Sequence, residues 1–294
     1  MLDKKTVIAL GYFDSLHLGH RVVISIAVEY AQSTQSTTTV FTFDGNVKNL
    51  TRGQQLPDVY TLEERRKMLY DMGVHSLFVA PVNKEYLSLS PTEFLTQLNQ
   101  ELNVCAYFCG EDYRFGCKGA GDVNFLIDYA NKHGQKVFVK KIELLDGEKV
   151  STTSVKQFLQ QGQIEKANEY LVNPYSICGV VNGDRKVGRS LGFPTANLSV
   201  DYKQSLLKQG VYAGVVKFDG QKYSAVINYG TRPTYGLDKP ILEAHLIDFK
   251  GDLYQKQITV EFLSFLRETQ KFSDGDSLKK QIAKDVERAK GIRL

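Results

Sequence analysis

The chain has 294 residues, a length that favours two domains over one. Its hydrophobic fraction of 42% and charged fraction of 24% are typical of a globular protein, and it contains no apolar run of about 18 residues that would predict a membrane span. The net charge of +4 comes from scattered lysines and not from a basic block, which argues against a nucleic-acid-binding protein.

The N-terminus leads into an apolar strand pattern without the core of a signal peptide, so we expect a cytoplasmic protein with reduced cysteines. Three of the four cysteines, Cys105, Cys109 and Cys117, cluster as metal ligands sometimes do. Because they include no C-x-x-C pair and have no nearby histidine, we expect buried core residues instead. The even spacing of Cys105 and Cys109 predicts that both lie on one face of a strand.

Strand and helix patterns alternate in the first half of the chain, which predicts a parallel sheet covered by helices. Ligands of such sheets bind beyond the carboxyl ends of the strands. Two helix starts carry capping signatures, Thr61 with Glu64 and Ser90 with Pro91. The expected strands are Val7–Leu10, Thr38–Thr42, Ser76–Ala80, Ala106–Cys109 and Val137–Lys140, and the expected helices are Arg21–Ala31, Leu62–Met72, Pro91–Glu101 and Asp122–Lys132.

The most informative stretch runs from Gly11 to His20, directly after the first expected strand. A glycine turn that opens into a helix presents free backbone N–H groups at the positive end of the helix dipole, which suits a phosphate. His17 and His20 lie three residues apart on one helix face, where they could hydrogen-bond a phosphoryl group as charge develops on it. The alternative is that both histidines only cap or pack the helix start. Their pairing beside two glycines favours the functional interpretation.

Two later segments of the first half fit the same kind of site. Gly110–Gly116 follows a strand, and its glycines and aromatic side chains could wall a planar ligand. A later segment places hydroxyl groups at a helix start and a lysine further along, which together could bind a second anion. Ordinary helix capping explains the hydroxyl groups equally well. The residues of that second segment are Ser151, Thr152, Thr153 and Lys156.

Beyond the turn at Asn173-Pro174 the pattern becomes β, and we place the domain boundary there, with domains of residues 1–172 and 173–294. Asp219-Gly220 marks a hairpin, and Asp276–Lys290 has an amphipathic helix pattern. These features predict a small antiparallel sheet or barrel with a C-terminal helix. The expected strands are Ile177–Val181, Val211–Phe218, Tyr223–Asn228, Leu242–Asp248 and Gln257–Phe262.

A glycine-rich run in the second half resembles a P-loop but lacks the two features that a P-loop requires. Arg189 stands in place of the required lysine, and Pro194 lies where the helix should follow. Thr195 and Asn197 alternate along the chain, so their oxygens can face one side and bind Mg²⁺ that carries a nucleotide. The glycines of the run, which would let backbone N–H groups reach phosphates, are Gly183, Gly188 and Gly192. A polar turn between strands is the alternative on residue type alone.

These motifs resemble a known family in order along nearly the whole chain. G-x-F-D-x-x-H-x-G-H from Gly11 resembles the nucleotidyltransferase signature, and with the two later segments it is similar to the N-terminal module of bacterial bifunctional riboflavin kinase/FAD synthetases. The run ending G-F-P-T-A-N at Asn197 resembles the riboflavin kinase signature, as do Asn228–Tyr235 and Leu242–Phe249. The chain departs from the family pattern at Ser15, at Asp44–Val47 and at Lys156, where the family has glycine, Pro-His-Pro and arginine.

The resemblance implies an α/β nucleotidyltransferase-type domain followed by a β-barrel kinase domain, and a transferase that phosphorylates riboflavin to FMN and adenylylates FMN to FAD, with ATP and Mg²⁺. Glu243 would be the base of the kinase, Thr195 and Asn197 its metal ligands, and His17 and His20 the catalytic histidines of adenylyl transfer. The implied ATP- and phosphate-binding residues are Gly11, Phe13, Asp14, Gly19, Ser151, Thr152, Thr153, Lys156, Gly183, Gly188, Arg189, Gly192 and Pro194. The implied flavin-binding residues are Asp112, Phe115, Asn228, Arg232 and Thr234.

Two other functions stay open at this point. Because the kinase motifs are intact and three N-terminal ones depart from the family pattern, the kinase activity is the more secure half of this interpretation. A non-catalytic flavin- or nucleotide-binding regulator with a decayed N-terminal site is the alternative. A nucleotidyltransferase for another acceptor, such as a phosphopantetheine, fits the first motif but gives no account of Gly192–Asn197 or Glu243. The expected partners are small molecules, without nucleic acid or membrane, and the chain is expected to be a monomer or a weak homo-oligomer. His245, alone in a strand, is expected to be a packed residue.

Overall fold

The computed structural model describes residues 4–53, 56–141, 144–145, 147–182, 193–199, 206–232 and 237–292. By contacts the chain divides into two compact units, Met1–Thr152 and Thr153–Leu294. In the part of the chain that the structure describes, no helix is long and apolar enough to cross a membrane.

The first unit is built on a five-stranded parallel sheet in the order β3-β2-β1-β4-β5. This confirms the parallel sheet predicted from the alternating pattern. The strand order reverses direction between β1 and β4, and the carboxyl ends of strands at such a switch point form the usual ligand site of this architecture. The strands are β1 (Thr6–Leu10), β2 (Thr37–Phe43), β3 (Ser76–Ala80), β4 (Val104–Gly110) and β5 (Lys136–Lys140), with a separate hairpin of β6 (Leu144–Leu145) and β7 (Glu148–Lys149).

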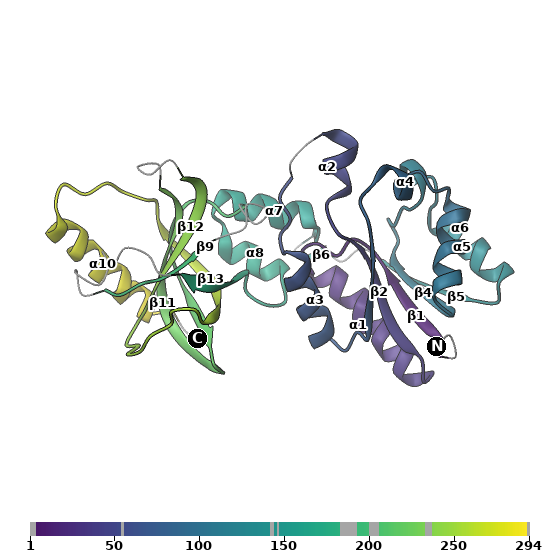
Figure 1. The fold of residues 1–294 in the computed structure, drawn as a ribbon, viewed down its shortest axis with the longest axis horizontal. Helices are drawn as coiled ribbons and strands as arrows, with labels where there is room; N and C mark the ends of the chain where they lie inside the picture. Colours follow the sequence, from purple (N-terminus) through teal and green to yellow (C-terminus); the bar gives the residue numbers. More distant parts are fainter. Residues whose placement is uncertain are drawn as a thin grey trace. The chain divides into compact units, whose positions relative to one another are not determined.

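Helices cover both faces of this sheet (Figure 1). Val7 and Ala9 of β1 pack on one face against α1 and α3, whereas Ile8 and Leu10 pack on the other against α5 and α6. Every residue of β1 is buried, because both of its faces are covered. The helices are α1 (Leu18–Ser33), α2 (Val47–Arg52), α3 (Leu62–Asp71), α4 (Lys84–Leu87), α5 (Pro91–Glu101) and α6 (Val123–Lys132).

The capping box predicted at Thr61 and the predicted Ser90 cap with Pro91 in the first turn are both present. Thr61 Oγ1 accepts from the backbone N–H of Glu64 at 3.3 Å, and the Glu64 carboxylate accepts from the Thr61 N–H at 2.9 Å. Ser90 and Glu93 repeat this exchange at the start of α5. The short helices α2 and α4 were not predicted, since each has a single asparagine cap and little hydrophobic periodicity.

A register shift in β4 corrects the prediction that two cysteines share a face. Thr6 of β1 pairs with Val104, but Val7 pairs with Ala106, so Cys105 is an extra residue in the ladder. Such a bulge reverses the side on which the following residues point. Cys105 consequently packs with the core on one face of the sheet, whereas Cys109 is buried in the core on the other. The two thiols therefore cannot be ligands of one metal ion.

Two short helices, α7 (Thr152–Gln161) and α8 (Ile164–Tyr170), precede the β-rich part of the chain. The predicted boundary at residues 172–173 assigns both helices to the first domain, whereas the structure bonds α8 to the second unit. Asn168 of α8 donates to the carbonyl of Phe262 at 2.8 Å and accepts from the N–H of Tyr175 at 2.8 Å. The contact-based division accordingly falls at the start of α7. The functional boundary at residues 172–173 stays a prediction.

The second unit is a closed antiparallel barrel in the order β10-β11-β12-β9-β8-β13, which confirms the barrel alternative of the prediction. The predicted hairpin turn is present: Asp219 and Gly220 have φ values of 52° and 75°, as a type I′ turn requires. The strands are β8 (Ser176–Asn182), β9 (Ala196–Ser199), β10 (Gly210–Phe218), β11 (Gln221–Arg232), β12 (Leu237–Leu246) and β13 (Gln257–Arg267).

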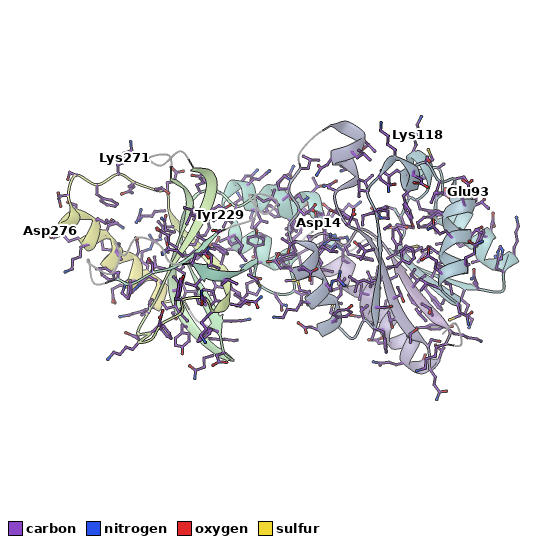
Figure 2. All side chains as sticks on the ribbon, viewed as in Figure 1. Asp14, Glu93, Lys118, Tyr229, Lys271 and Asp276 are labelled. Atoms are coloured by element: carbon purple, nitrogen blue, oxygen red, sulfur yellow. The ribbon has the colours of Figure 1, made fainter. Side chains whose placement is uncertain are left out.

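Large aromatic side chains fill the barrel. Tyr212, Tyr229 (Figure 2) and Phe262 are almost fully buried and meet edge to face. Gly214 is required beside them, because a Cβ atom at that position would collide with the carbonyl oxygen of Glu261 on the neighbouring strand. The interior is therefore a packed core, and a ligand of this unit must bind outside it.

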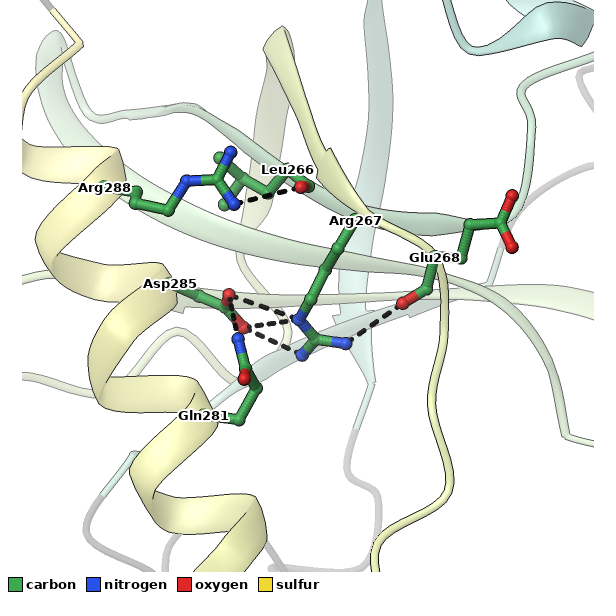
Figure 3. Close-up of polar contacts among 6 residues, drawn as sticks. All are labelled: Leu266, Arg267, Glu268, Gln281, Asp285 and Arg288. Atoms are coloured by element: carbon green, nitrogen blue, oxygen red, sulfur yellow. Dashed lines mark hydrogen bonds and ion pairs between the residues drawn. The ribbon is translucent and has the colours of Figure 1, made fainter.

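The C-terminal helix α10 (Gly275–Lys290) covers part of the outer surface of β10 and β11. A buried ion pair links it to the barrel (Figure 3). Arg267 at the end of β13 donates from Nε and Nη2 to the Asp285 carboxylate, at 3.0 and 2.8 Å for Oδ2, and Gln281 donates to Oδ1 at 3.0 Å. Arg288 donates to the carbonyl of Leu266 at 3.0 Å, so two helix residues three positions apart are bonded to the end of one strand.

Candidate active sites

The first candidate site begins where β1 ends. Gly11 is needed there because a Cβ atom would lie 2.8 Å from Cζ of Phe13, whose ring folds back over this position. Phe13 is buried and has a φ of 51°, and Leu16 has a φ of 47°. Left-handed backbone at a bulky residue costs on the order of 1–3 kcal/mol and is retained only where the surroundings impose it. The turn is thus held in one strained conformation.

His17 and His20 stand side by side after this turn. His17 caps α1, and its Nδ1 accepts from the backbone N–H of His20 at 3.3 Å. The two rings stack with centroids 3.7 Å apart, and the edge of the Phe13 ring meets His20 at 5.2 Å. Because Nδ1 of His17 accepts a hydrogen bond, this ring carries its proton on Nε2, which can act as a donor. Gly19 lies between the histidines in the first turn of α1.

Both histidines are neutral at physiological pH. Burial lowers the pKa of His17 to about 4, against an opposing effect of Asp112. Burial also lowers the pKa of His20 well below its ordinary value, and repulsion from a protonated His17 and from Arg65 acts in the same direction. The pair therefore offers hydrogen-bond donors to a phosphoryl group without carrying positive charge of its own in the unliganded site.

Ser15, which departs from the family pattern, connects two of the predicted phosphate-binding segments. Its hydroxyl is fully buried and lies 2.9 Å from the hydroxyl of Thr152, where α7 begins. The structure thus brings the Gly11–His20 turn together with the start of the second predicted segment. Ser151 precedes this position, Thr153 follows it, and Lys156 lies one helical turn further along α7.

Asp14 of the turn (Figure 2) and Arg65 of α3 are both buried. Asp14 Oδ1 accepts from the backbone N–H of Val59 at 2.7 Å, which fixes the segment that precedes α3. Arg65 of α3 bonds the carbonyl of Tyr12 at 2.8 Å. Sequence reasoning did not find Arg65, because one arginine in a highly charged helix has no local signal that distinguishes it from its solvated neighbours.

The two residues of the first unit that are predicted to contact flavin lie in different surroundings. Asp112 is exposed and forms an ion pair of 2.8 Å with Lys149 of β7. Phe115 is 5% exposed and packs between Phe94 and Tyr113, so its ring belongs to the hydrophobic core and does not line an open surface in this state. A flavin contact of either residue stays a prediction.

The second candidate site is a row of polar side chains across the outer surface of the barrel. Glu243 of β12 pairs with Asn197 of β9 on one side and with Asn228 of β11 on the other. Directly paired residues of neighbouring strands point to the same face. Leu242 and Ala244, which flank Glu243 along its strand, are fully buried and point the opposite way. Asn228 Nδ2 donates to Oε2 of Glu243 at 3.1 Å, so the neighbours of this carboxylate across the sheet are amides.

Asn197 has the features of a metal ligand. Its side chain is 8% exposed, and its Oδ1 is buried with no hydrogen-bond partner among the described residues. Thr195 precedes it on an exposed segment. Buried oxygens normally find a partner, so an unsatisfied amide oxygen beside a carboxylate is a place for a hard cation such as Mg²⁺.

His245 supports this segment by packing. Its Nδ1 lies 2.9 Å from the carbonyl oxygen of Pro194, and its ring meets that of Phe193 edge to face at 5.2 Å. These contacts fit the expectation that His245 is a packed residue. The predicted phosphate-binding residues Gly183, Gly188, Arg189 and Gly192 and the predicted flavin contact Thr234 lie outside the described residues, as does the side chain of Arg232.

The fold and the two sites together define a two-domain enzyme that handles nucleotides. The first unit has a nucleotidyltransferase-type sheet with two histidines at its switch point, and the second has a barrel with a carboxylate between two amides. The family model described as FAD synthetase matches residues 1–154, and the one described as riboflavin kinase matches residues 171–293.

Proteins that are similar to nearly the whole chain are named for both activities. The bifunctional riboflavin kinase/FMN adenylyltransferase of Bacillus subtilis is 34% identical over 97% of this chain and 92% of its own length. The protein of the same name from Escherichia coli K12 is 32% identical over 95% of this chain and 90% of its own length. The chain therefore belongs to the bifunctional riboflavin kinase/FMN adenylyltransferase family.

A solved structure shares the complete fold. The crystal structure of a macrolide-efflux protein from Streptococcus pneumoniae matches with a TM-score of 0.90 and 26% identity, and covers 99% of this chain and 95% of that one. The two-unit architecture described above is thus also found in an experimental structure.

Proposed function

We propose that this chain phosphorylates riboflavin to FMN in its second unit and adenylylates FMN to FAD in its first, with ATP as the donor in both reactions. The observation that carries the proposal is the order of the two family matches along the chain, each of which contains one of the two assembled sites. No comparison favours a non-catalytic regulator. The family matches give no reason to regard the kinase half as more secure than the adenylyltransferase half.

In the kinase reaction, Glu243 accepts the proton of the ribityl 5′-hydroxyl as that oxygen attacks the γ-phosphorus of ATP, and ADP leaves. Asn228 holds the carboxylate through the hydrogen bond to Oε2. This contact supports a role for Asn228 in orienting the base, beside or instead of the predicted contact with the flavin.

The residues next to Glu243 fit a magnesium ion. Asn197 Oδ1 is buried without a hydrogen-bond partner among the described residues, and the hydroxyl of Thr195 lies two residues before it along the chain. We propose that these two side chains hold Mg²⁺, which when bound neutralises charge on the phosphates of ATP. Asn197 and Thr195 would then orient the nucleotide relative to the hydroxyl that Glu243 deprotonates.

In the adenylyl transfer, a phosphate oxygen of FMN attacks the α-phosphorus of ATP, and the bond from that phosphorus to the bridging oxygen breaks to release pyrophosphate. His17 donates from Nε2 to the phosphates as negative charge develops on them, and His20 holds its ring in place by stacking. The predicted phosphate-binding residues of this site are Gly11, Phe13, Asp14, Gly19, Ser151, Thr152, Thr153 and Lys156.

We further propose that the chain acts in the cytoplasm on these small molecules alone, as a monomer or a weak homo-oligomer. The proposal as a whole is tested by incubating the wild-type protein with ATP and Mg²⁺ and either riboflavin or FMN, and separating the flavins by chromatography over time. We expect FMN and then FAD from riboflavin, FAD from FMN, and no turnover after chelation of the metal. Binding of flavin without any product would support the regulator instead.

A further inference from the structure

One buried positive charge lies close to the first site. Arg65 of α3 is 1% exposed, yet none of the ion pairs formed between described residues involves it. A guanidinium removed from water normally pairs with a carboxylate, because the desolvation of an unpaired charge is costly. A buried arginine that lacks such a pair needs another physical reason for its position.

The hydrogen bonds of Arg65 go to residues at the ends of two strands. Nη1 donates to the carbonyl oxygen of Tyr12 at 2.8 Å and to Oγ1 of Thr42 at 2.7 Å, and Nη2 donates to the carbonyl oxygen of Phe43 at 3.3 Å. Oγ1 of Thr42 in turn donates to the same Tyr12 carbonyl at 2.7 Å. The guanidinium also lies 4.8 Å from the centroid of the Tyr12 ring. Arg65 therefore joins the residues that follow β1 to the end of β2.

The Tyr12 carbonyl belongs to the peptide unit that precedes Phe13. Two donors hold this peptide in place directly before Phe13, whose φ is 51°. With this φ, the Phe13 ring folds over Gly11 and presents its edge to His20, which stacks on His17. A continuous series of contacts thus leads from the guanidinium to the two catalytic histidines.

We propose that Arg65 is a positioning residue for adenylyl transfer, which holds the strained turn in the conformation that places His17 and His20 for the phosphates. This inference rests on the proposed function of the first unit. Lysine cannot replace it fully, because an ammonium is a point charge and cannot bond three oxygens in the fixed geometry of a guanidinium. The charge of Arg65 also helps to keep His20 neutral, in addition to burial and the influence of His17.

The test compares three variants in both reactions of the same polypeptide. We expect Arg65→Met to lower kcat for FMN adenylylation by about 100-fold, the loss that follows a misplacement of roughly 1 Å, with little change in KM for FMN. Arg65→Lys should lie between this variant and the wild type. Arg66→Met is the matched control, because Arg66 is the next residue of α3, half-exposed, and paired only at 3.6 Å with Glu63. All three variants should keep wild-type riboflavin kinase activity.

The side-chain NMR signals of the histidines separate positioning from unfolding. The chain has 5 histidines, which makes each resonance assignable by substitution. In Arg65→Met we expect the signals of His17 and His20 to shift while those of His75 and His133, in the same unit, stay in place. Collapse of all four to unfolded positions would show that Arg65 only maintains the fold, and unchanged adenylyl transfer in Arg65→Met would equally overturn the proposal. Absence of FAD with the wild-type protein would instead refute the proposed function itself.

Discussion

Asn228 and Glu243, on neighbouring strands of the barrel, are joined by a hydrogen bond of 3.1 Å from the amide nitrogen to Oε2. The sequence assigns Asn228 to the flavin by resemblance, whereas the register of β11 and β12 places it against the proposed base. A hydrogen bond from the amide to one carboxylate oxygen fixes the orientation of a group that has to accept a proton from the substrate.

The first prediction concerns this pair. Asn228→Ala should lower kcat of the kinase reaction by about 10- to 100-fold, since a hydrogen bond to a charged group contributes about 1.5–3 kcal/mol. Adenylylation of added FMN by the same variant should be unchanged and serves as the control for folding and concentration. Steady-state kinetics with riboflavin as the varied substrate measure the effect. A raised KM for riboflavin at unchanged kcat would show that Asn228 binds the flavin and does not orient the base.

The second prediction concerns the pH dependence of stability in the first unit. The unfolded chain protonates His17 near pH 6.5, but the folded chain does so only near pH 4, so acidification through this interval adds a proton mainly to the unfolded state. The contribution of His17 to the free energy of unfolding is therefore fully present above pH 6.5 and is lost as the pH falls toward 4. The difference of about 2.5 pH units corresponds to about 3 kcal/mol. Urea unfolding at several pH values should show a shallower acid dependence in His17→Gln, and identical slopes would contradict the account.

The third prediction concerns the attachment of α10. The Asp285 carboxylate is 1% exposed and accepts from both Arg267 and Gln281 (Figure 3). Asp285→Ala should lower the free energy of unfolding of the barrel by about 3–5 kcal/mol, because it leaves a guanidinium largely buried without its partner. The double variant Arg267→Met/Asp285→Leu should recover most of this loss. A double variant as unstable as Asp285→Ala would show that the helix depends on the charges themselves.

Features set by a few neighbouring residues could be predicted from the sequence. The capping box at Thr61, the Ser90 cap and the hairpin at Asp219-Gly220 depend only on residues within one turn, and all three are present. The parallel pairing of the first sheet followed from the alternation of strands and helices, and the histidine pair from its three-residue spacing at the start of α1.

Features that depend on strand register or on distant contacts could not be predicted. The bulge at Cys105 exists only relative to β1, and the amides beside Glu243 come from strands 15 and more residues away along the chain. Arg65 meets Tyr12 across 53 residues of sequence, and nothing near it along α3 indicates that it is buried. Single-sequence patterns carry no information on such pairings until the fold brings them together.

The central claim is that one chain holds two separate catalytic sites that act in succession. It is tested most directly by the flavins that Glu243→Gln and His17→Ala produce with ATP and Mg²⁺. We expect Glu243→Gln to form no FMN from riboflavin but to convert added FMN to FAD at the wild-type rate, and His17→Ala to convert riboflavin to FMN that accumulates without FAD. Loss of both reactions in either variant, or wild-type product patterns in both, would contradict the assignment of the two sites.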